Sequence, residues 1–428
     1  MPPNHVQHRR TLPPLSITRR LLNIGLRSAT LTSKFALIFV LAKFLEPADV
    51  GLYGLFAATI MFVLMGLGAD FYTYASREMI VSRRDLWAAM IRDQGAFFLI
   101  SYTFLLPVCL ILFGVELLPW HLAIWFFPLL ALEHIAQELN RLLVALSYPL
   151  WASIVLFVRS GLWAIVVAIW LWFDPSQRTL NFVLSNWLCG VIAACVLGLV
   201  PLRKLNTASL ALAIDWHWIR RGIRIALPFL VATLSLRALY TVDRYWIESL
   251  GGVEVLAAYV LFIGFANALN SFMDAAVFSF AYPALIASAS RQDHAALKLQ
   301  MRRLMIQTTV AVIVLASGLL IAAPWVIDWL DNPIYAQHYP LLYWTVLGAV
   351  LFALSMVPHY GLYALRRDRP IILTHLVSLP LFAICTLIFT TPLDDRAVPA
   401  AAAAAFAFLF GAKYMAFRRS SASIDGHL

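Results

Sequence analysis

The sequence predicts an all-α polytopic membrane protein with about twelve transmembrane helices. Of its 428 residues, 62% are hydrophobic and only 13% are charged, and the mean hydropathy is +0.81. This composition excludes a soluble multidomain protein. Apolar segments long enough to cross about 30 Å of hydrocarbon recur along the chain, and basic residues gather in every second connection between them.

Twelve segments have the length of about twenty apolar residues that a membrane-spanning helix needs. We place these spans at residues 21–45, 50–75, 94–113, 120–145, 151–173, 181–202, 223–248, 254–282, 305–328, 336–365, 371–391 and 397–417. The chain then divides into a disordered basic arm (1–20), a six-helix bundle (21–202), an amphipathic linker (203–222), a second six-helix bundle (223–417) and a tail (418–428). The linker carries tryptophans beside arginines, which is typical of an interfacial helix.

The basic residues predict the orientation of the chain. If the N-terminal arm lies in the cytoplasm, the outer connections contain only Arg178 and Arg396, whereas every inner connection is basic. The outer connections are short and acidic, which leaves no room for an outer domain. By the positive-inside rule, we expect the arm, the linker and both termini to be cytoplasmic.

Signals of soluble chemistry are missing from the sequence. It contains no GxxxxGK[ST], HExxH or GxSxG motif, so we expect no enzyme, cofactor or metal site and no ATP-driven pumping by this chain alone. Cys109, Cys189, Cys195 and Cys385 lie in apolar segments, and we expect them to be buried, inert thiols. The net charge of +10 is read as a topology signal rather than as a sign of nucleic-acid binding.

The two halves share a weak pattern that predicts an internal parallel repeat of six helices. Residues of similar type recur at an offset of about 205 positions. The pairs are Leu45 with Leu250, Asp49 with Glu254, Tyr53 with Tyr259, Asp70 with Asp274 and Lys34 with Arg237. A chance alignment of apolar sequence is the alternative.

Spans one and seven carry charges that need an explanation, since one arginine at the bilayer centre costs roughly 3 kcal/mol on insertion scales. Lys34 and Arg237 lie at matching depths, ~20 Å along their helices. Arg27 precedes Lys34 and Arg244 follows Arg237 by two helical turns, which predicts a cationic stripe on each helix. Asp243 is the only acid deep in either span.

Two interpretations of these cations remain. In the first, they line a water-filled cavity that receives an anionic ligand. In the second, acids of other spans, namely Glu133, Glu138, Asp70 and Asp274, neutralise them in structural ion pairs. Other cations near span ends, such as Lys43 and Lys413, can extend to the membrane interface.

Span four adds a possible proton site. His134, Glu138 and Arg141 share one helix face, and a His–Glu pair at membrane depth could exchange protons near neutral pH. The alternative is a structural bridge from Glu138 to Arg141 or to Arg159.

Two further acids, Asp274 and Asp70, can be explained by a structural role instead of a functional one. In span eight, Asn267, Asn270 and Asp274 form a polar stripe, for which helix packing is the favoured interpretation. In span two, Asp70 has a possible partner in Arg77.

Two segments resemble a known family. "LAKFLEPADVGLYGLFAATIMFVLMGLGADFYTYASREM" (41–79) and "ALPFLVATLSLRALYTVDRYWIESLGGVEVLAAYVL" (226–261) are similar to the corresponding spans of oligosaccharide flippases in polysaccharide biosynthesis. These flippases belong to the multidrug/oligosaccharidyl-lipid/polysaccharide (MOP) exporter superfamily. The anchors are Leu45, Pro47, Gly51, Tyr53, the Gly66–Gly68 turn, Pro228, Asp243, Arg244 and Tyr259.

This resemblance implies a V of two six-helix bundles around a central cavity that is lined chiefly by spans one, two, seven and eight. It also implies flipping of an undecaprenyl-diphosphate-linked oligosaccharide to the outer leaflet of a bacterial cytoplasmic membrane, by alternating access with ion coupling. The expected partners are this glycan lipid, membrane lipid and polysaccharide-assembly proteins such as a polymerase, and no nucleic acid.

We therefore expect Lys34 and Arg237 to hold the diphosphate, and Arg27 and Arg244 to extend its path. The candidates for coupling or gating are Asp243, Glu133, His134, Glu138, Asp70 and Asp274. A multidrug or cation exporter of the same superfamily is one alternative, although acids would then have to dominate the cavity. A membrane-embedded polymerase or ligase is the other, although such enzymes generally have a large outer loop.

Overall fold

The computed structural model describes residues 17–425, which form helices joined by short connections, with no strand in that range. The helices are Ile17–Phe44 (α1), Pro47–Gly68 (α2), Tyr72–Val81 (α3), Trp87–Val108 (α4), Leu110–Gly114 (α5), Ala123–Ala145 (α6), Pro149–Phe157 (α7), Trp163–Phe173 (α8), Leu180–Leu199 (α9), Trp216–Met273 (α10), Ser279–Ser290 (α11), His294–Leu330 (α12), Pro333–Gln337 (α13), Pro340–Ala364 (α14), Asp368–Leu393 (α15) and Ala397–Asp425 (α16).

The predicted number of membrane-length helices is confirmed, although the second predicted span (50–75) ends at Gly68. Ten helical stretches are long and apolar enough to cross a membrane, and two of them, Trp216–Ser290 and Asp368–Ser420, each contain two expected spans. Gly252, with φ 79° and ψ 179°, divides the first of these stretches, because a glycine without Cβ accepts this conformation. The turn at Asp394–Arg396 divides the second. The chain is a multi-pass membrane protein.

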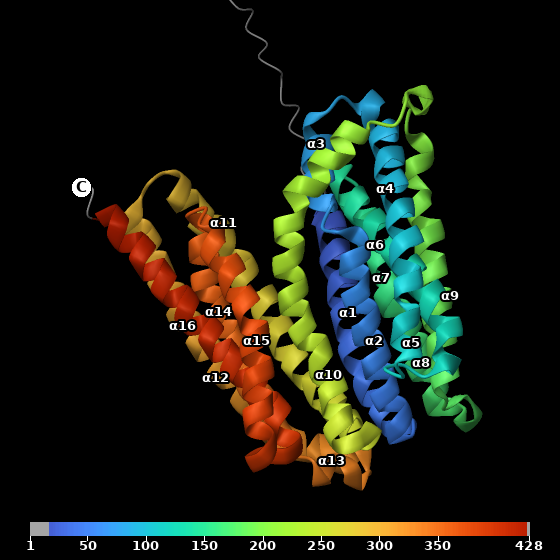
Figure 1. The fold of residues 1–428 in the computed structure, drawn as a ribbon, viewed down its shortest axis with the longest axis vertical. Coiled ribbons are helices and arrows are strands. Elements are labelled where there is room, and N and C mark those ends of the chain that lie inside the picture. The colour runs from blue at the N-terminus through green and yellow to red at the C-terminus, as the bar shows by residue number, and fades with distance from the viewer. Residues whose placement is uncertain (1–16, 426–428) are drawn as a thin grey trace, which may run out of the picture.

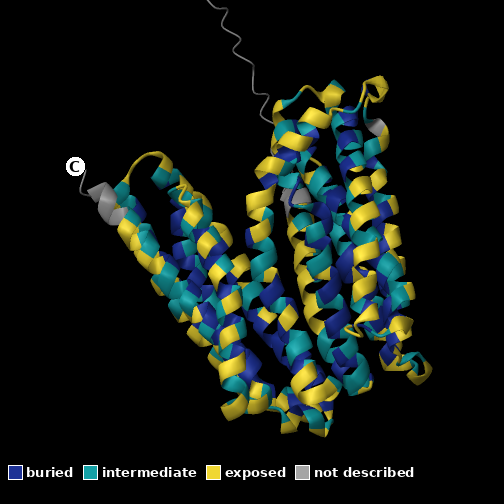
Figure 2. Cartoon of the chain, in the orientation of Figure 1, coloured by how far each residue is buried: buried dark blue, intermediate teal, exposed yellow. Residues whose placement is uncertain are grey.

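The helices form two lobes arranged as a V (Figure 1). The N-lobe contains α1–α9, the C-lobe contains α11–α16, and the long α10 connects them. The lobes meet at the narrow end, beside α13, and stand apart at the wide end, where α1 begins and α16 ends. Exposed residues cover the outer faces of both lobes (Figure 2). Many of them are large and apolar, such as Phe104 and Ile313, as lipid-facing side chains should be.

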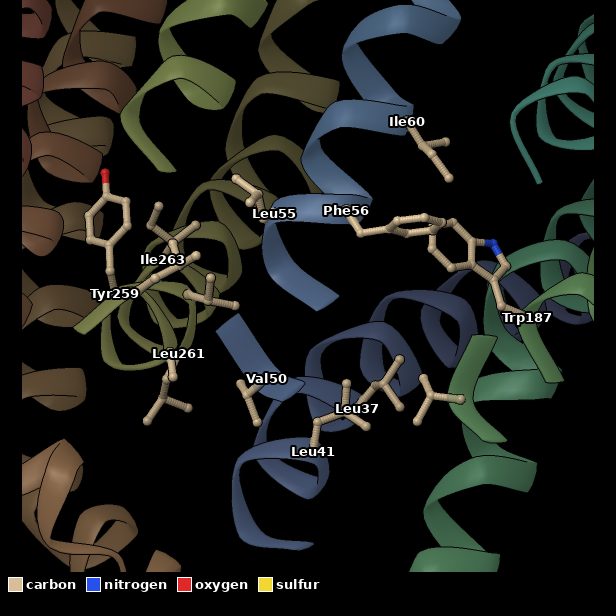
Figure 3. Packing of buried hydrophobic residues seen from close by; sticks show 14 of the residues in the cluster. Leu37, Leu41, Val50, Leu55, Phe56, Ile60, Trp187, Tyr259, Leu261 and Ile263 are labelled. Atoms are coloured by element: carbon tan, nitrogen blue, oxygen red, sulfur yellow. The ribbon is translucent and has the colours of Figure 1, made fainter. Parts of the chain in front are cut away.

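One core runs across the narrow end (Figure 3). There α2 crosses the part of α10 that follows Gly252, so the expected repeat partners, spans two and eight, pack on each other. Gly51 and Gly54 permit this approach, because a Cβ at Gly51 would lie 2.5 Å from the carbonyl oxygen of Val253, and one at Gly54 would overlap with Val260.

The linker differs from the expected interfacial helix. It consists of two short 3₁₀ turns, Pro201–Lys204 and Ala208–Ala211, and α10 begins at Trp216. The reason is local: the Asp215 side chain accepts a hydrogen bond from Trp218 N (2.9 Å) and caps a new helix.

Two other boundary expectations also change. Residues 17–20 of the expected disordered arm are helical, and residues 1–16 lie outside the described range. The expected tail at 418–428 is helical as far as Asp425. Of the four cysteines, Cys189 is exposed rather than buried, because it lies on an outward face of α9.

Candidate functional site

Lys34 lies on the face of α1 that is turned toward the C-lobe. One turn later, Ile38 packs on Gly264 of α10, where an added Cβ would lie 2.8 Å from Ile38 Cγ2. Residues four apart share a helix face, so Lys34 continues this face toward the wide end. Its side chain is accessible at the surface of the chain and makes no ion pair or hydrogen bond with residues 17–425, although the charges of Arg159 and Glu133 in the N-lobe act on it. Lys34 therefore has no side-chain partner among residues 17–425 and lies one helical turn from a contact between α1 and α10, toward the wide end.

Arg237 has the equivalent place on α10. Thr241, one turn later, donates to the carbonyl oxygen of Ala58 on α2 (3.5 Å). After a second turn, Tyr245 hydroxyl lies 2.5 Å from Thr59 Oγ1. Arg237 is exposed, and within the described residues its guanidinium has no ion-pair partner. On both helices, a cation thus lies one turn to the wide side of the contacts that join the lobes.

Arg27 and Arg244 differ in solvent exposure and in the number of their side-chain partners. Arg27 is exposed, and its Nε donates to Ser153 Oγ of α7 (3.2 Å), which leaves the other guanidinium donors open. Arg244 forms an ion pair with Asp243 (3.2 Å) and also donates to the carbonyl oxygen of Tyr240. Its side chain is only 12% exposed. The expected cationic stripe on span seven is therefore reduced to Arg237, because Asp243 neutralises Arg244.

Asp243 lies in the C-lobe beside a cavity of about 40 Å³. Tyr259 hydroxyl donates to Asp243 Oδ2 (2.8 Å). Asn267 and Asn270 also line the cavity, and Asn270 Oδ1 has no hydrogen-bond partner. Most of its lining is apolar, and Asp243, Asn267 and Asn270 supply polar groups.

The expected stripe of span eight does not extend to Asp274. Asn267 and Asn270 face the cavity, whereas Asp274 is exposed at the start of a π-helical turn, Asp274–Phe278. Asp274 N still donates to the carbonyl oxygen of Asn270, so Asp274 keeps the α-helical register, and the π turn changes the register only of the residues after it.

In the N-lobe, Glu133 and Arg159 form a buried ion pair at 2.5 Å. Trp187 Nε1 donates to the other oxygen of Glu133 (2.6 Å), so this carboxylate links spans four, five and six. Arg159 belongs to the π-helical turn Val158–Leu162, which presents it to α6. The expected bridge from Glu138 to Arg159 is wrong, because Glu133 holds this arginine.

His134 and Glu138 have separate partners. His134 is fully buried, and its Nδ1 lies 2.7 Å from Tyr102 hydroxyl. Glu138 accepts from Arg141 (2.6 Å) and from Gln94 (3.0 Å). No hydrogen bond joins His134 to Glu138 among the described residues, so the geometry favours the structural bridge over the proposed His–Glu proton pair.

Asp70 also lacks its expected partner. It is 7% exposed and adopts a left-handed conformation (φ 49°) just after α2. Within residues 17–425 it forms no ion pair with Arg77. The turn that separates α2 from α3 breaks the helical spacing on which that pair depended.

An apolar cavity of about 490 Å³ lies between α1, α10 and α12. Aromatic side chains from all three helices line it: Phe35, Phe39, Phe265, Phe272 and Trp329. Phe35 directly follows Lys34, so the two side chains lie at the same level of α1 but point about 100° apart, and Lys34 does not line the cavity.

The sequence did not predict the hydrogen bonds of Lys43 or the burial of Lys413. Lys43 does not extend to the interface but donates to the carbonyl oxygens of Trp329 (2.6 Å) and Leu330 (3.2 Å) at the end of α12. Lys413 is 0% exposed. The predicted end of span twelve at residue 417 gives Lys413 a terminal place, whereas α16 continues to Asp425.

The fold is similar to that of solved transporters of the MOP superfamily. No protein-family model and no curated protein matches the chain. A solved inward-facing multidrug resistance MATE family transporter of the MOP superfamily is similar in structure, with 14% identity over 94% of this chain and 99% of that chain, at a TM-score of 0.78. An outward-facing structure of such a transporter gives 14% identity over 96% and 95%, at a TM-score of 0.59.

A third solved structure, a MOP superfamily transporter from Pyrococcus furiosus, is described as having a binding pocket of reverse polarity that suggests a different function. It is 14% identical over 95% of each chain, at a TM-score of 0.60. The chain superposes better on the inward-facing structure than on the outward-facing one.

Proposed function

We propose that the chain is a flippase that moves a lipid-linked oligosaccharide, joined to undecaprenol through a diphosphate, from the cytoplasmic to the outer leaflet. The observation that supports this most directly is the pair of open cations, Lys34 and Arg237, at the same level of the two lobes. A diphosphate offers several anionic oxygens to such donors, and charge-assisted hydrogen bonds of this kind are strong.

The partners of the deep acids support an anionic substrate. Glu133, Glu138 and Asp243 are each neutralised by an arginine inside one lobe. They are therefore not available to attract a cation, whereas Lys34 and Arg237 form no ion pair within residues 17–425. The excess charge between the lobes is positive, as an anionic ligand requires.

The apolar cavity supports a lipid anchor on this substrate. Its 490 Å³ is bounded by α1, α10 and α12, so it lies at the level of Lys34 rather than inside one lobe. A prenyl chain in the bilayer already lies in hydrocarbon, so Phe35, Phe39 and Phe272 would hold it by van der Waals packing rather than by the hydrophobic effect. A headgroup at Lys34 and a tail in this cavity are within reach of each other.

The conformation fits the loading step of alternating access. The wide end of the V carries the basic connections, and the positive-inside rule places that end in the cytoplasm, with both termini, in a bacterial cytoplasmic membrane. The substrate would then enter from the inner leaflet. Release would need the contacts at the narrow end to part, as in the outward-facing relative.

Asp243 is our candidate for ion coupling. It is 2% exposed, lies beside the small cavity of the C-lobe, and is one of the residues through which the sequence resembles the flippases. Glu133, His134 and Glu138 are better explained as structural groups of the N-lobe.

One observation favours a second candidate, export of cationic drugs. Asp274 is exposed on span eight and could attract a cation, and solved structures of similar fold are described as multidrug transporters. Whether the protein binds an anionic or a cationic substrate therefore has to be tested with one ligand of each charge.

Binding to the full chain in lipid nanodiscs makes this test. We expect undecaprenyl diphosphate to bind and to be weakened by Lys34→Met or Arg237→Met, whereas undecaprenol and the dye ethidium bind weakly or not at all. Lys298→Met, an exposed lysine of α12, is the matched control. Tight ethidium binding that Asp274→Asn abolishes, with no binding of the diphosphate, would establish the drug exporter instead.

A further inference from the structure

Three basic side chains meet inside the C-lobe. Lys413 comes from α16, His375 from α15 and His359 from α14. Lys413 is 0% exposed and His375 is 8% exposed. The two imidazole rings lie parallel, 10° apart in orientation, with their centroids 6.0 Å apart. The charge of Lys413 acts on both rings, so the three groups form one cluster, which we call the C-lobe triad.

Each member of the C-lobe triad has an unsatisfied nitrogen. Lys413 Nζ, His375 Nε2 and His359 Nδ1 are buried and have no hydrogen-bond partner. No acid among the described residues forms an ion pair with any of the three. Buried polar atoms are normally hydrogen-bonded, because an unpaired one costs about 1–3 kcal/mol. Three buried nitrogens without hydrogen-bond partners at one place indicate that a ligand binds there.

The chemistry of the three groups specifies that ligand. An ammonium has three donors and no acceptor, whereas a neutral imidazole has one of each. If Lys413 is charged, the two imidazoles supply acceptors for it. If Lys413 is neutral, it becomes an acceptor for an imidazole N–H. None of these bonds is formed in the present structure, but small side-chain movements would allow them in two states that differ by one proton.

The surroundings offer a route for this proton. Tyr360, next to His359 on α14, has its ring 5.7 Å from that of His359. Asp274 exerts its charge on Tyr360 and is exposed at the π-helical turn after α10. Tyr282 of α11 and Tyr363 of α14 are the other titratable neighbours of Tyr360. From α12, Met301 packs at Gly361 near this level, and it carries no charge.

We propose that Lys413, His359 and His375 form a binding site for a single proton, reached from the space between the lobes through Asp274 and Tyr360. Proton binding adds a charge between α14, α15 and α16 and changes which of the three groups can donate a hydrogen bond. This inference deepens the proposed function by naming the C-lobe as the place of proton coupling. The site itself can be tested without any transported substrate.

Solid-supported-membrane electrophysiology measures the proposed event. Liposomes that contain the full chain receive a step in pH, and the transient current reports protons binding within the membrane. We expect wild type to give a saturable charge displacement, Lys413→Met to lose it, and Lys298→Met to keep it. His359→Gln and His375→Gln together should shift the midpoint by about one pH unit, because each removes a hydrogen-bond partner of the proton.

The alternatives give different results. Wild-type currents in Lys413→Met, or an unshifted midpoint in the folded double histidine variant, would overturn the proton site. If Lys413→Met fails to reach the membrane, the histidine variant carries the test. A current that disappears when chloride is replaced by gluconate, at constant pH, would identify an anion site and overturn the proposal. Failure of undecaprenyl diphosphate to bind would refute the flippase function and leave these currents unchanged.

Discussion

Lys43 Nζ lies 2.6 Å from the carbonyl oxygen of Trp329 and 3.2 Å from that of Leu330, so a lysine of the N-lobe caps the last turn of a C-lobe helix. The ammonium meets the negative end of the α12 dipole and satisfies two terminal carbonyls. Tyr335 hydroxyl adds a weaker bond across the same gap, to the carbonyl oxygen of Ala42 (3.3 Å). These bonds hold the narrow end closed.

The first prediction concerns this cap. Lys43→Met should shift the lobes toward the outward-facing arrangement by roughly 1 kcal/mol, the scale of a partly exposed charged contact. Distances between spin labels at Arg83 and Ser290, near the wide ends of the two lobes in a cysteine-free chain, report the shift. Tyr335→Phe, which removes one long neutral bond, should have a smaller effect. Identical distance distributions in Lys43→Met and wild type would exclude a role of the cap in closure.

A second prediction concerns the close approach of α2 and α10. Gly54→Ala should obstruct the narrow end, because the new methyl group overlaps with Val260, at a cost of about 1–3 kcal/mol to the closed arrangement. Gly66→Ala is the matched control, since nothing lies within 4 Å of its Cβ and alanine favours a helix. The same spin labels measure both variants. Equal behaviour of the two alanines would contradict the packing that we describe.

The third prediction tests the buried pair of the N-lobe. Arg159→Met should destabilise the protein by about 3–5 kcal/mol, because it leaves Glu133 charged, buried and without its partner. Glu133→Gln with Arg159→Met should recover part of that loss. Thermal unfolding of wild type, the two single variants and the double variant gives the coupling free energy. Strict additivity would show that the two side chains do not act as a pair.

Hydropathy and charge position were enough to predict the spans, because the bilayer fixes the length of a crossing helix and each half of α10 satisfies it alone. The same reasoning proposed Lys34 and Arg237 as cavity-lining cations, which stays a prediction. It could not predict the partners of the acids. Glu133 reaches Arg159 on the next span, and the π-helical turn that aims Arg159 at it leaves no clear sign in the sequence.

The burial of Lys413 was the second feature that could not be predicted from the sequence. Lys413 lies near the expected end of span twelve, where a lysine ordinarily extends to the interface. In the structure α16 continues beyond it, and Lys413 faces α14 and α15. Only the packing of three helices reveals this, because the residues that surround Lys413 come from distant parts of the chain.

The central claim is that Lys34 and Arg237 contact the substrate and do not serve folding. Neither cation forms a side-chain bond to another described residue, so its removal should leave the free energy of unfolding nearly unchanged. A lost charge-assisted contact to a diphosphate should weaken transport roughly tenfold or more.

The most direct measurement is export of lipid-linked surface glycan in a strain that lacks this protein, complemented with wild type, Lys34→Met, Arg237→Met or Lys298→Met at equal membrane abundance. We predict that wild type and Lys298→Met restore export, and that Lys34→Met and Arg237→Met leave the glycan in the inner leaflet. Full export by both of the latter variants would contradict the cationic site.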